Sequence, residues 1–222
     1  MERIICVAVG YVFGLFQTGY LVGKAQNIDI RKYGSGNAGS TNALRVLGWK
    51  SGILTFIGDC MKCILAILLM SLCFKKSCAD ILPLLKLYTG VGVTLGHNFP
   101  FYLRFKGGKG IAVMAGLILS TSWWMSLICL VIFVTVVFAT RYISLGSLLL
   151  SLLFAVMLVI KGQTGGFGVS QACLWEMYVL GFALMALAWY RHKANIKRLL
   201  TGTENKFGAP GKKPVPSEKK EK

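Results

Sequence analysis

Seven long apolar runs, separated by short polar segments, dominate the chain. They cover approximately residues 4–22, 52–73, 81–96, 110–120, 123–139, 145–160 and 174–190. A helix needs about 20 apolar residues to cross the ~30 Å hydrocarbon core of a bilayer, and several runs approach that length. The pattern predicts an all-α polytopic membrane protein with about seven transmembrane helices, five or six being the alternatives. The runs at 81–96 and 110–120 are short, so we expect tilted, broken or partly re-entrant helices there.

Composition supports this fold class. The 222 residues are 55% hydrophobic and only 15% charged, and the mean hydropathy of +0.63 is too high for an ordinary soluble domain. No signal-peptide cleavage pattern follows the first apolar run, so we interpret it as a true span. We expect residues 1–207 to form a single integral-membrane domain. Residues 208–222 are rich in Pro, Gly, Lys and Glu and are predicted to be a disordered basic tail.

The distribution of basic residues predicts the orientation. With seven crossings and the N-terminus outside, nineteen of the 25 Lys and Arg residues lie in inner segments, four lie outside and two within spans. The positive-inside rule then places the C-terminus in the cytoplasm, together with the three Gly-rich or Arg-rich loops after residue 30, at 96–110 and near 140. The net charge of +17 suits an anionic membrane surface, and nucleic acid is a poor alternative partner.

The first polar loop, after residue 30, combines glycines with short polar side chains. Its glycines match Gly-x-Gly-x-x-Gly, but a membrane span rather than a β-strand precedes them, which argues against a dinucleotide site. Glycines let successive amides turn toward one point, and hydroxyl and amide side chains favour a helix start. The loop is either an anion site or only a polar capped turn. Its candidate ligands are Gly34, Ser35, Gly36, Asn37, Thr41, Asn42 and Arg45.

The stretch from residue 96 to 110 holds the strongest candidate chemistry. Fixed cations beside glycines, just before a helix start, predict a phosphate site. It is not a Walker P-loop, because Ile111 stands where that motif has Ser or Thr. It also lacks the aspartate that common glycerolipid acyltransferases carry five residues after their histidine. The candidates here are His97, Lys106, Gly107, Gly108, Lys109 and Gly110.

Further polar residues lie within the other apolar runs or near their ends. Asp59 and Lys62 are three apart in an apolar run, so we expect an internal ion pair that shapes the site. Nothing in the sequence requires a metal or cofactor, and a metal site at the lone Cys-x-x-Cys of residues 60–63 is improbable. The remaining site candidates, in the loop near 140 and in a basic amphipathic segment after 190, are Arg141, Ser144, His192 and Asn195.

Together these motifs resemble the bacterial acyl-phosphate:glycerol-3-phosphate acyltransferases over about residues 3–207. The carrying motifs are Gly-Ser-Gly-Asn-x-Gly-x-Thr-Asn, Gly-His-x-x-Pro…Phe-Lys-Gly-Gly-Lys-Gly, Thr-Arg-Tyr-x-Ser-Leu-x-Ser and Asn-Ile-x-Arg-Leu-Leu-x-Gly-Thr-Glu. The resemblance implies transfer of a fatty acyl group from acyl phosphate to the 1-hydroxyl of glycerol 3-phosphate, giving lysophosphatidic acid and phosphate for phospholipid synthesis. It implies no need for acyl-CoA or acyl-carrier protein, and an active site on the cytoplasmic face of the bacterial cytoplasmic membrane, among membrane lipids.

Roles follow from that resemblance. Catalytic roles fall to His97, Lys109, Ser35 and Arg45. Residues 107–110 are expected to hold the phosphate of the acyl phosphate. Glycerol phosphate is expected at Ser35, Asn37, Thr41, Arg45, Lys106, Arg141, Ser144 and Asn195. The proton of the attacking hydroxyl goes to His97, to His192 or to a phosphate oxygen of the donor. We favour the last, because neither histidine has an evident carboxylate to orient it.

Two other functions fit parts of the pattern. A transporter for a phosphorylated anion predicts an inverted repeat and a site at mid-membrane, whereas these polar motifs gather toward one face. A CDP-alcohol phosphotransferase needs clustered aspartates around a divalent ion. Here Asp29, Asp59 and Asp80 are widely separated.

Overall fold

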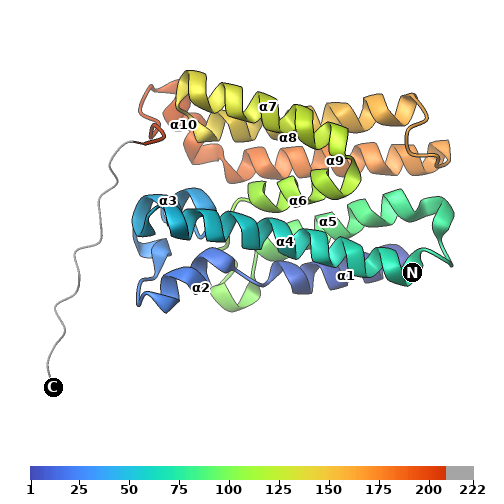
Figure 1. Cartoon of the computed structure of the whole chain (residues 1–222), viewed down its shortest axis with the longest axis horizontal. Coiled ribbons are helices and arrows are strands. Elements are labelled where there is room, and N and C mark those ends of the chain that lie inside the picture. Colours follow the sequence, from blue (N-terminus) through green and yellow to red (C-terminus); the bar gives the residue numbers. More distant parts are fainter. Residues whose placement is uncertain (209–222) are drawn as a thin grey trace, which may run out of the picture.

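Helices running back and forth along one long axis form the whole described fold, in a computed structural model that describes residues 1–208 (Figure 1). No strand occurs within that range, so the predicted all-α class is confirmed. The predicted basic tail falls, from residue 209 onward, outside the described residues. The α-helices are α1 (Glu2–Gly14), α2 (Thr18–Ala25), α3 (Ser40–Leu47), α4 (Trp49–Phe74), α5 (Leu82–Asn98), α6 (Ile111–Thr121), α7 (Trp123–Thr140), α8 (Ile143–Gln163), α9 (Gln171–Arg191) and α10 (Lys193–Leu200).

Each of the seven apolar runs falls on helix. Among the described residues, five segments are long and apolar enough to cross a membrane: Glu2–Ala25, which combines α1 and α2, and helices α4, α7, α8 and α9. Helices α5 and α6 have 17 and 11 residues and are shorter, as their runs predicted. The basic segment after residue 190 forms the short helix α10.

The first apolar run, interpreted as one span, is interrupted in the structure. Helix α1 ends at Gly14 and α2 begins at Thr18, so three residues lie between them. The break leaves carbonyl groups without intrahelical partners deep in an apolar region, where each must find another donor. Apolar periodicity alone gives no sign of this interruption.

Close packing between α1 and α5 fixes where the break lies. Four glycines face each other across the two helices, and a side chain at any of them would collide with backbone. A Cβ atom on Gly14 would stand 2.3 Å from the carbonyl oxygen of Val93, and one on Gly92 would stand 2.2 Å from that of Val7. Small residues allow such approach between membrane helices, where dispersion contacts drive association. The other two glycines of this contact are Gly10 and Gly96.

The polar loops gather at one end of the bundle. In Figure 1 the loop after α2, the α7–α8 turn and helices α3 and α10 all lie at the left end. The α4–α5 and α8–α9 connections lie at the opposite end, with the N-terminus. The predicted convergence of the polar motifs is therefore present in the fold.

The α1–α5 contact yields a stability prediction. Gly92→Ala places a methyl group against a carbonyl oxygen, so it should destabilise the protein by roughly 1–3 kcal/mol. We expect a lower melting temperature in detergent. Gly181→Ala is the matched control, because its Cβ would meet only the flexible end of Leu158. Equal melting temperatures for the two variants would show that α1 and α5 do not depend on backbone contact.

Candidate functional site

A cavity of about 280 Å³ opens where the polar loops converge. Its wall is built from the loop before α3, one side of α4, the beginnings of α6 and α8, and α10 with the segment after it. The polar lining residues are Ser35, Asn37, Ser40, Thr41, Asn42, Arg45, Asp59, His97, Lys109, Ser144, Ser147, His192, Asn195, Glu204 and Asn205.

Three helices begin at this cavity. Helices α3, α6 and α8 each contribute first-turn residues to its lining: Ser40 and Thr41, Ile111 and Ala112, and Ile143 and Ser144. The first four N–H groups of a helix lack intrahelical acceptors, and the helix dipole places partial positive charge there. The Ser144 hydroxyl is buried without a protein partner. The cavity is therefore suited to anions.

Two cations reinforce this character. Arg45 and Lys109 both line the cavity, and burial lowers the pKa of each. The pKa of Lys109 falls to about 8, because burial and nearby arginines outweigh the opposite influence of Glu204. Lys109 donates to the amide oxygen of Asn195, whose Nδ2 donates to Glu204 over 2.8 Å. This chain of contacts ties the loop before α6 to α10.

The loop before α6 differs from a simple glycine cradle. The amides of Gly107 and Gly108 donate to the carbonyls of Asn98 and His97, at 3.3 and 3.0 Å. Their own carbonyls accept from the Arg191 guanidinium, at 3.1 and 2.8 Å. Both glycines therefore use their backbone groups within the protein.

Steric space explains these two glycines. A Cβ on Gly107 would stand 2.0 Å from the carbonyl oxygen of His97, and one on Gly108 would stand 1.9 Å from its Nε2. Glycine is required there so that the loop can lie on the histidine. Neither residue lines the cavity, whereas Lys109 and Gly110 do.

Asn42 organises the first polar loop. Its Nδ2 donates to the carbonyls of Ile30, Tyr33 and Asn37 at 2.8–3.1 Å, and its Oδ1 accepts from the amide of Ser35 at 2.8 Å. Asn42 lines the cavity, yet its amide group is engaged by the loop. The side chain thereby holds Ser35 and Asn37 at the cavity.

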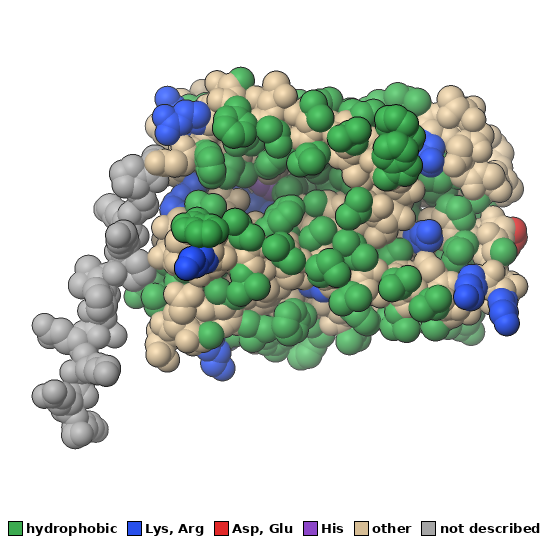
Figure 2. Space-filling view, viewed as in Figure 1, with side chains coloured by type: hydrophobic (Ala, Val, Ile, Leu, Met, Phe, Trp, Pro, Cys, Tyr) green, Lys and Arg blue, Asp and Glu red, His purple; other side chains and the backbone are tan. Residues whose placement is uncertain are grey.

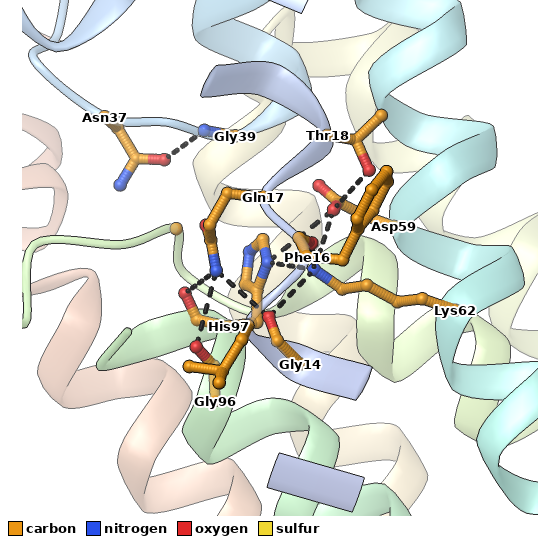
Figure 3. Close-up of polar contacts among 12 residues, drawn as sticks. Gly14, Phe16, Gln17, Thr18, Asn37, Gly39, Asp59, Lys62, Gly96 and His97 are labelled. Carbon is orange, nitrogen blue, oxygen red and sulfur yellow. Dashed lines mark hydrogen bonds and ion pairs between the residues drawn. The ribbon is translucent and has the colours of Figure 1, made fainter. Parts of the chain in front are cut away.

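A buried polar cluster lies behind the cavity, at the break between α1 and α2 (Figure 3). The Lys62 ammonium donates to the carbonyl oxygen of Phe16 at 2.6 Å and approaches that of Gly14 at 3.4 Å. Gln17 Nε2 donates to the carbonyls of Gly14 and His97, at 3.1 and 3.0 Å. These side chains supply the donors that the interrupted helix lacks.

Lys62 also contacts Asp59 Oδ1 and His97 Nδ1, each at 2.9 Å, which forms the predicted ion pair. Thr18 donates its hydroxyl to the same carboxylate oxygen at 3.0 Å. The carboxylate nearest to His97 is that of Asp59, whose Oδ1 lies 3.7 Å from Nδ1, beyond hydrogen-bond distance, so the group that contacts Nδ1 is the Lys62 ammonium. An ammonium can only donate, so Nδ1 accepts and the neutral ring carries its proton on Nε2.

His192 has the opposite arrangement. Its Nδ1 lies 2.8 Å from the carbonyl oxygen of Ala188, which can only accept, so Nδ1 carries the proton. Burial and the charge of Lys109 lower the pKa of His192 to about 4, which leaves the ring neutral near pH 7. Its Nε2 is then an acceptor at the cavity.

The structure brings most of the predicted site residues together and leaves six outside the lining. Lys106 is exposed, and Arg141 donates to the carbonyl of Phe207 at 3.0 Å. The six outside are Gly34, Gly36, Lys106, Gly107, Gly108 and Arg141. Sequence reasoning missed Glu204, although a single acidic residue in a strongly basic segment is a usable signal. It also did not assign Ser40, Ser147 and Asn205 to the site, although Ser147 ends the Thr-Arg-Tyr-x-Ser-Leu-x-Ser motif.

Comparison with known proteins identifies relatives of almost full length. The glycerol-3-phosphate acyltransferase family matches residues 4–202. The glycerol-3-phosphate acyltransferase of Thermoanaerobacter sp. (strain X514) is 38% identical over 94% of this chain and 97% of its own. That of Clostridioides difficile (strain 630) is 41% identical over 92% and 95%.

Solved structures agree with these relatives. PlsY (YgiH), an integral membrane glycerol 3-phosphate acyltransferase, superimposes in its glycerol 3-phosphate form with a TM-score of 0.80. The identity is 31%, with 94% of this chain and 96% of that chain covered. Its lysophosphatidic acid form gives a TM-score of 0.78 at 30% identity.

Anion binding should depend on pH through Lys109. Below its pKa of about 8 the side chain is an ammonium, and above that value the charge is lost. We expect the affinity for methyl phosphate, whose second pKa is about 6, to fall as pH rises through 8. Lys109→Arg should retain affinity to about pH 10. Lys50→Arg, at an exposed lysine, should behave as wild type. Calorimetry measures the affinity at each pH. A wild-type affinity that stays unchanged from pH 7 to about 9.5 would contradict the prediction.

Removing the Lys62 ammonium should destabilise the fold. Lys62→Met leaves the Asp59 carboxylate buried without its cation and the Phe16 carbonyl without its donor, at a cost of about 3–5 kcal/mol. Lys86→Met is the control, because Lys86 has no hydrogen bond or ion pair among the described residues. Thermal unfolding in detergent measures both, and similar small shifts would contradict a stabilising role for the cluster.

Proposed function

Because the chain belongs to the glycerol-3-phosphate acyltransferase family, we propose that it acylates the 1-hydroxyl of glycerol 3-phosphate with an acyl phosphate as donor. The chain is a multi-pass membrane protein and a glycerol-3-phosphate acyltransferase that makes lysophosphatidic acid. The proposed part is the donor, together with the residues that bind each substrate and the orientation in the membrane. The observation that supports it best is the meeting of three helix starts with Arg45 and Lys109 at one cavity.

The donor proposal rests on the chemistry that the cavity offers. Both an acyl phosphate and glycerol 3-phosphate carry a phosphate, and the cavity has donors and cations on several walls. Among the described lining residues, no serine is hydrogen-bonded to a histidine, so no nucleophile is activated as in an acyl-enzyme mechanism. A mixed anhydride is already activated. The protein then needs to orient two substrates and stabilise charge.

We assign one phosphate to each side of the cavity. The donor phosphate would meet the start of α6, with Lys109 and Gly110. Gly107 and Gly108 shape that loop and do not contact the ligand. Glycerol 3-phosphate would lie toward the start of α3 and α8, where Arg45, Ser35, Asn37, Thr41, Ser144 and Asn195 line the wall.

The acyl chain would leave the cavity toward lipid. Part of the lining is apolar and comes from α4, α7 and α8, namely Ile53, Phe56, Phe133 and Ile143. Figure 2 shows a histidine within a hollow that hydrophobic side chains flank. A fatty chain can lie in such a slot while its activated end meets the polar wall.

His97 would act as a donor in this reaction. Its Nδ1 accepts from Lys62, so the Nε2 proton is the group it can offer to an anionic oxygen. This supports a role in stabilising the oxyanion or the phosphate. The proton of the attacking hydroxyl would then pass to the departing phosphate, which becomes strongly basic as the anhydride bond breaks.

We place the cavity on the cytoplasmic side of the bacterial cytoplasmic membrane. The loops at that end of the bundle carry most of the basic residues, as the positive-inside rule requires of a cytoplasmic face. The N-terminus lies at the opposite end and would be outside.

A donor assay tests the proposal. Purified protein with palmitoyl phosphate and labelled glycerol 3-phosphate should produce labelled lysophosphatidic acid, equally with and without EDTA. Palmitoyl-CoA in place of palmitoyl phosphate should give no product, because the donor site binds a phosphate directly on the acyl group. Arg45→Ala should raise KM for glycerol 3-phosphate at least ~10-fold, since it removes a charge-assisted contact.

The assay also separates the alternatives. Turnover with palmitoyl-CoA alone would overturn the donor. Uptake of glycerol 3-phosphate into liposomes without acylated product would favour a transporter. The Asp80→Asn variant, changed at an exposed residue of the opposite end, should behave as wild type throughout.

A further inference from the structure

One oxygen of Asp59 is a buried acceptor without a protein partner among the described lining residues. This carboxylate is 1% exposed, and its Oδ1 accepts from Lys62 and Thr18. Its Oδ2 is buried and has no protein partner, although Asp59 lines the cavity. A buried carboxylate oxygen without a donor is costly, so a ligand donor is expected to complete it.

Asp59 lies further along α4 than the part of that helix that packs beside Arg45. Residues Gly52, Ile53, Phe56 and Asp59 follow one face of α4 along the cavity wall. Seven residues of helix correspond to about 10 Å, so Asp59 lies roughly that far along α4 from Gly52, which packs on Leu44 beside Arg45. A ligand whose phosphate lies beside Arg45 would extend toward Asp59 with its other end.

The hydrogen-bonding groups of glycerol 3-phosphate determine which of its two ends would lie beside Asp59. An ionised carboxylate oxygen only accepts hydrogen bonds, and a phosphate dianion has none to give. The two hydroxyls of glycerol 3-phosphate are its only donors. The carboxylate therefore repels the phosphate and attracts the hydroxyl end.

We propose that Asp59 Oδ2 accepts the hydrogen bond of the attacking hydroxyl of glycerol 3-phosphate and aims that oxygen at the acyl carbonyl. The inference rests on the proposed function. The hydroxyl oxygen forms the new bond to the acyl carbon while the bond from that carbon to the phosphate oxygen breaks. The hydroxyl proton, which Oδ2 accepts as a hydrogen bond before the attack, passes to an oxygen of the departing phosphate as the new bond forms, and Asp59 remains a carboxylate.

The contacts of Oδ1 explain how this geometry is held. Lys62 and Thr18 fix Oδ1 from α4 and from the first turn of α2, which leaves Oδ2 as the free oxygen (Figure 3). The Lys62 ammonium lies on the Oδ1 side of the carboxylate, so it does not occupy the position from which a ligand would reach Oδ2. The break between α1 and α2 thereby serves the site, because it brings Thr18 to the carboxylate.

Ligand binding without any acyl donor tests the proposal. The probes are glycerol 3-phosphate and 2-hydroxypropyl phosphate, which lacks the attacking hydroxyl, measured by calorimetry on full-length protein in detergent. Wild type should prefer glycerol 3-phosphate by roughly tenfold or more, as a hydrogen bond to a charged group implies. Asp59→Asn should reduce that preference to about threefold or less, and Asp80→Asn should retain it.

A second variant keeps the test decisive if Asp59→Asn does not fold. Thr18→Val is close in shape and removes the hydroxyl that fixes Oδ1, so the preference should fall at least about threefold. An unchanged preference in the folded variants would overturn the inference and leave the proposed function intact. Failure of wild type to bind glycerol 3-phosphate at all would overturn both.

Discussion

The centre of this structure depends on one buried ammonium group, that of Lys62. The Lys62 side chain is only 5% exposed and contacts the carbonyls of the interrupted first span, the Asp59 carboxylate and the ring of His97. A charge in a membrane interior is tolerated only where polar partners surround it. The interruption supplies carbonyl acceptors, and the ammonium supplies the donor that those carbonyls lack. The broken helix and the buried lysine therefore each require the other.

The same contacts connect the fold to the site. Gln17 bridges the end of α1 and the end of α5, so the break and the loop before α6 are fixed relative to one another. Gly107 and Gly108 then lie on His97 and receive Arg191 on their carbonyls. The loop reaches the start of α6 in a defined position. The starts of α3, α6 and α8 at the cavity are suited to an anion without any contribution from side chains.

Charge separation within the cavity gives it direction. Arg45, Lys109 and the helix starts form a positive wall, while the Asp59–Lys62 pair presents one carboxylate oxygen elsewhere on the lining. In the proposed reaction, the positive wall would bind the two phosphate groups and the carboxylate oxygen would bind one hydroxyl. With an acyl phosphate as the donor, as we propose, orientation of the two substrates would be sufficient for acyl transfer without a strong base.

The sequence by itself determined the all-α membrane class, the positions of the apolar helices and most of the polar lining residues, because apolar length and polar motifs are local properties. It also indicated the pairing of Asp59 with Lys62, which follows from helical spacing. Tertiary structure alone decided the break after Gly14, since that depends on contact with α5 and on Lys62. It likewise decided that Gly107 and Gly108 serve close packing and that Glu204 joins the site. In the sequence, a glycine that frees an amide for a ligand cannot be distinguished from one that makes room for a histidine. Only the residues that folding places next to the glycine distinguish the two roles.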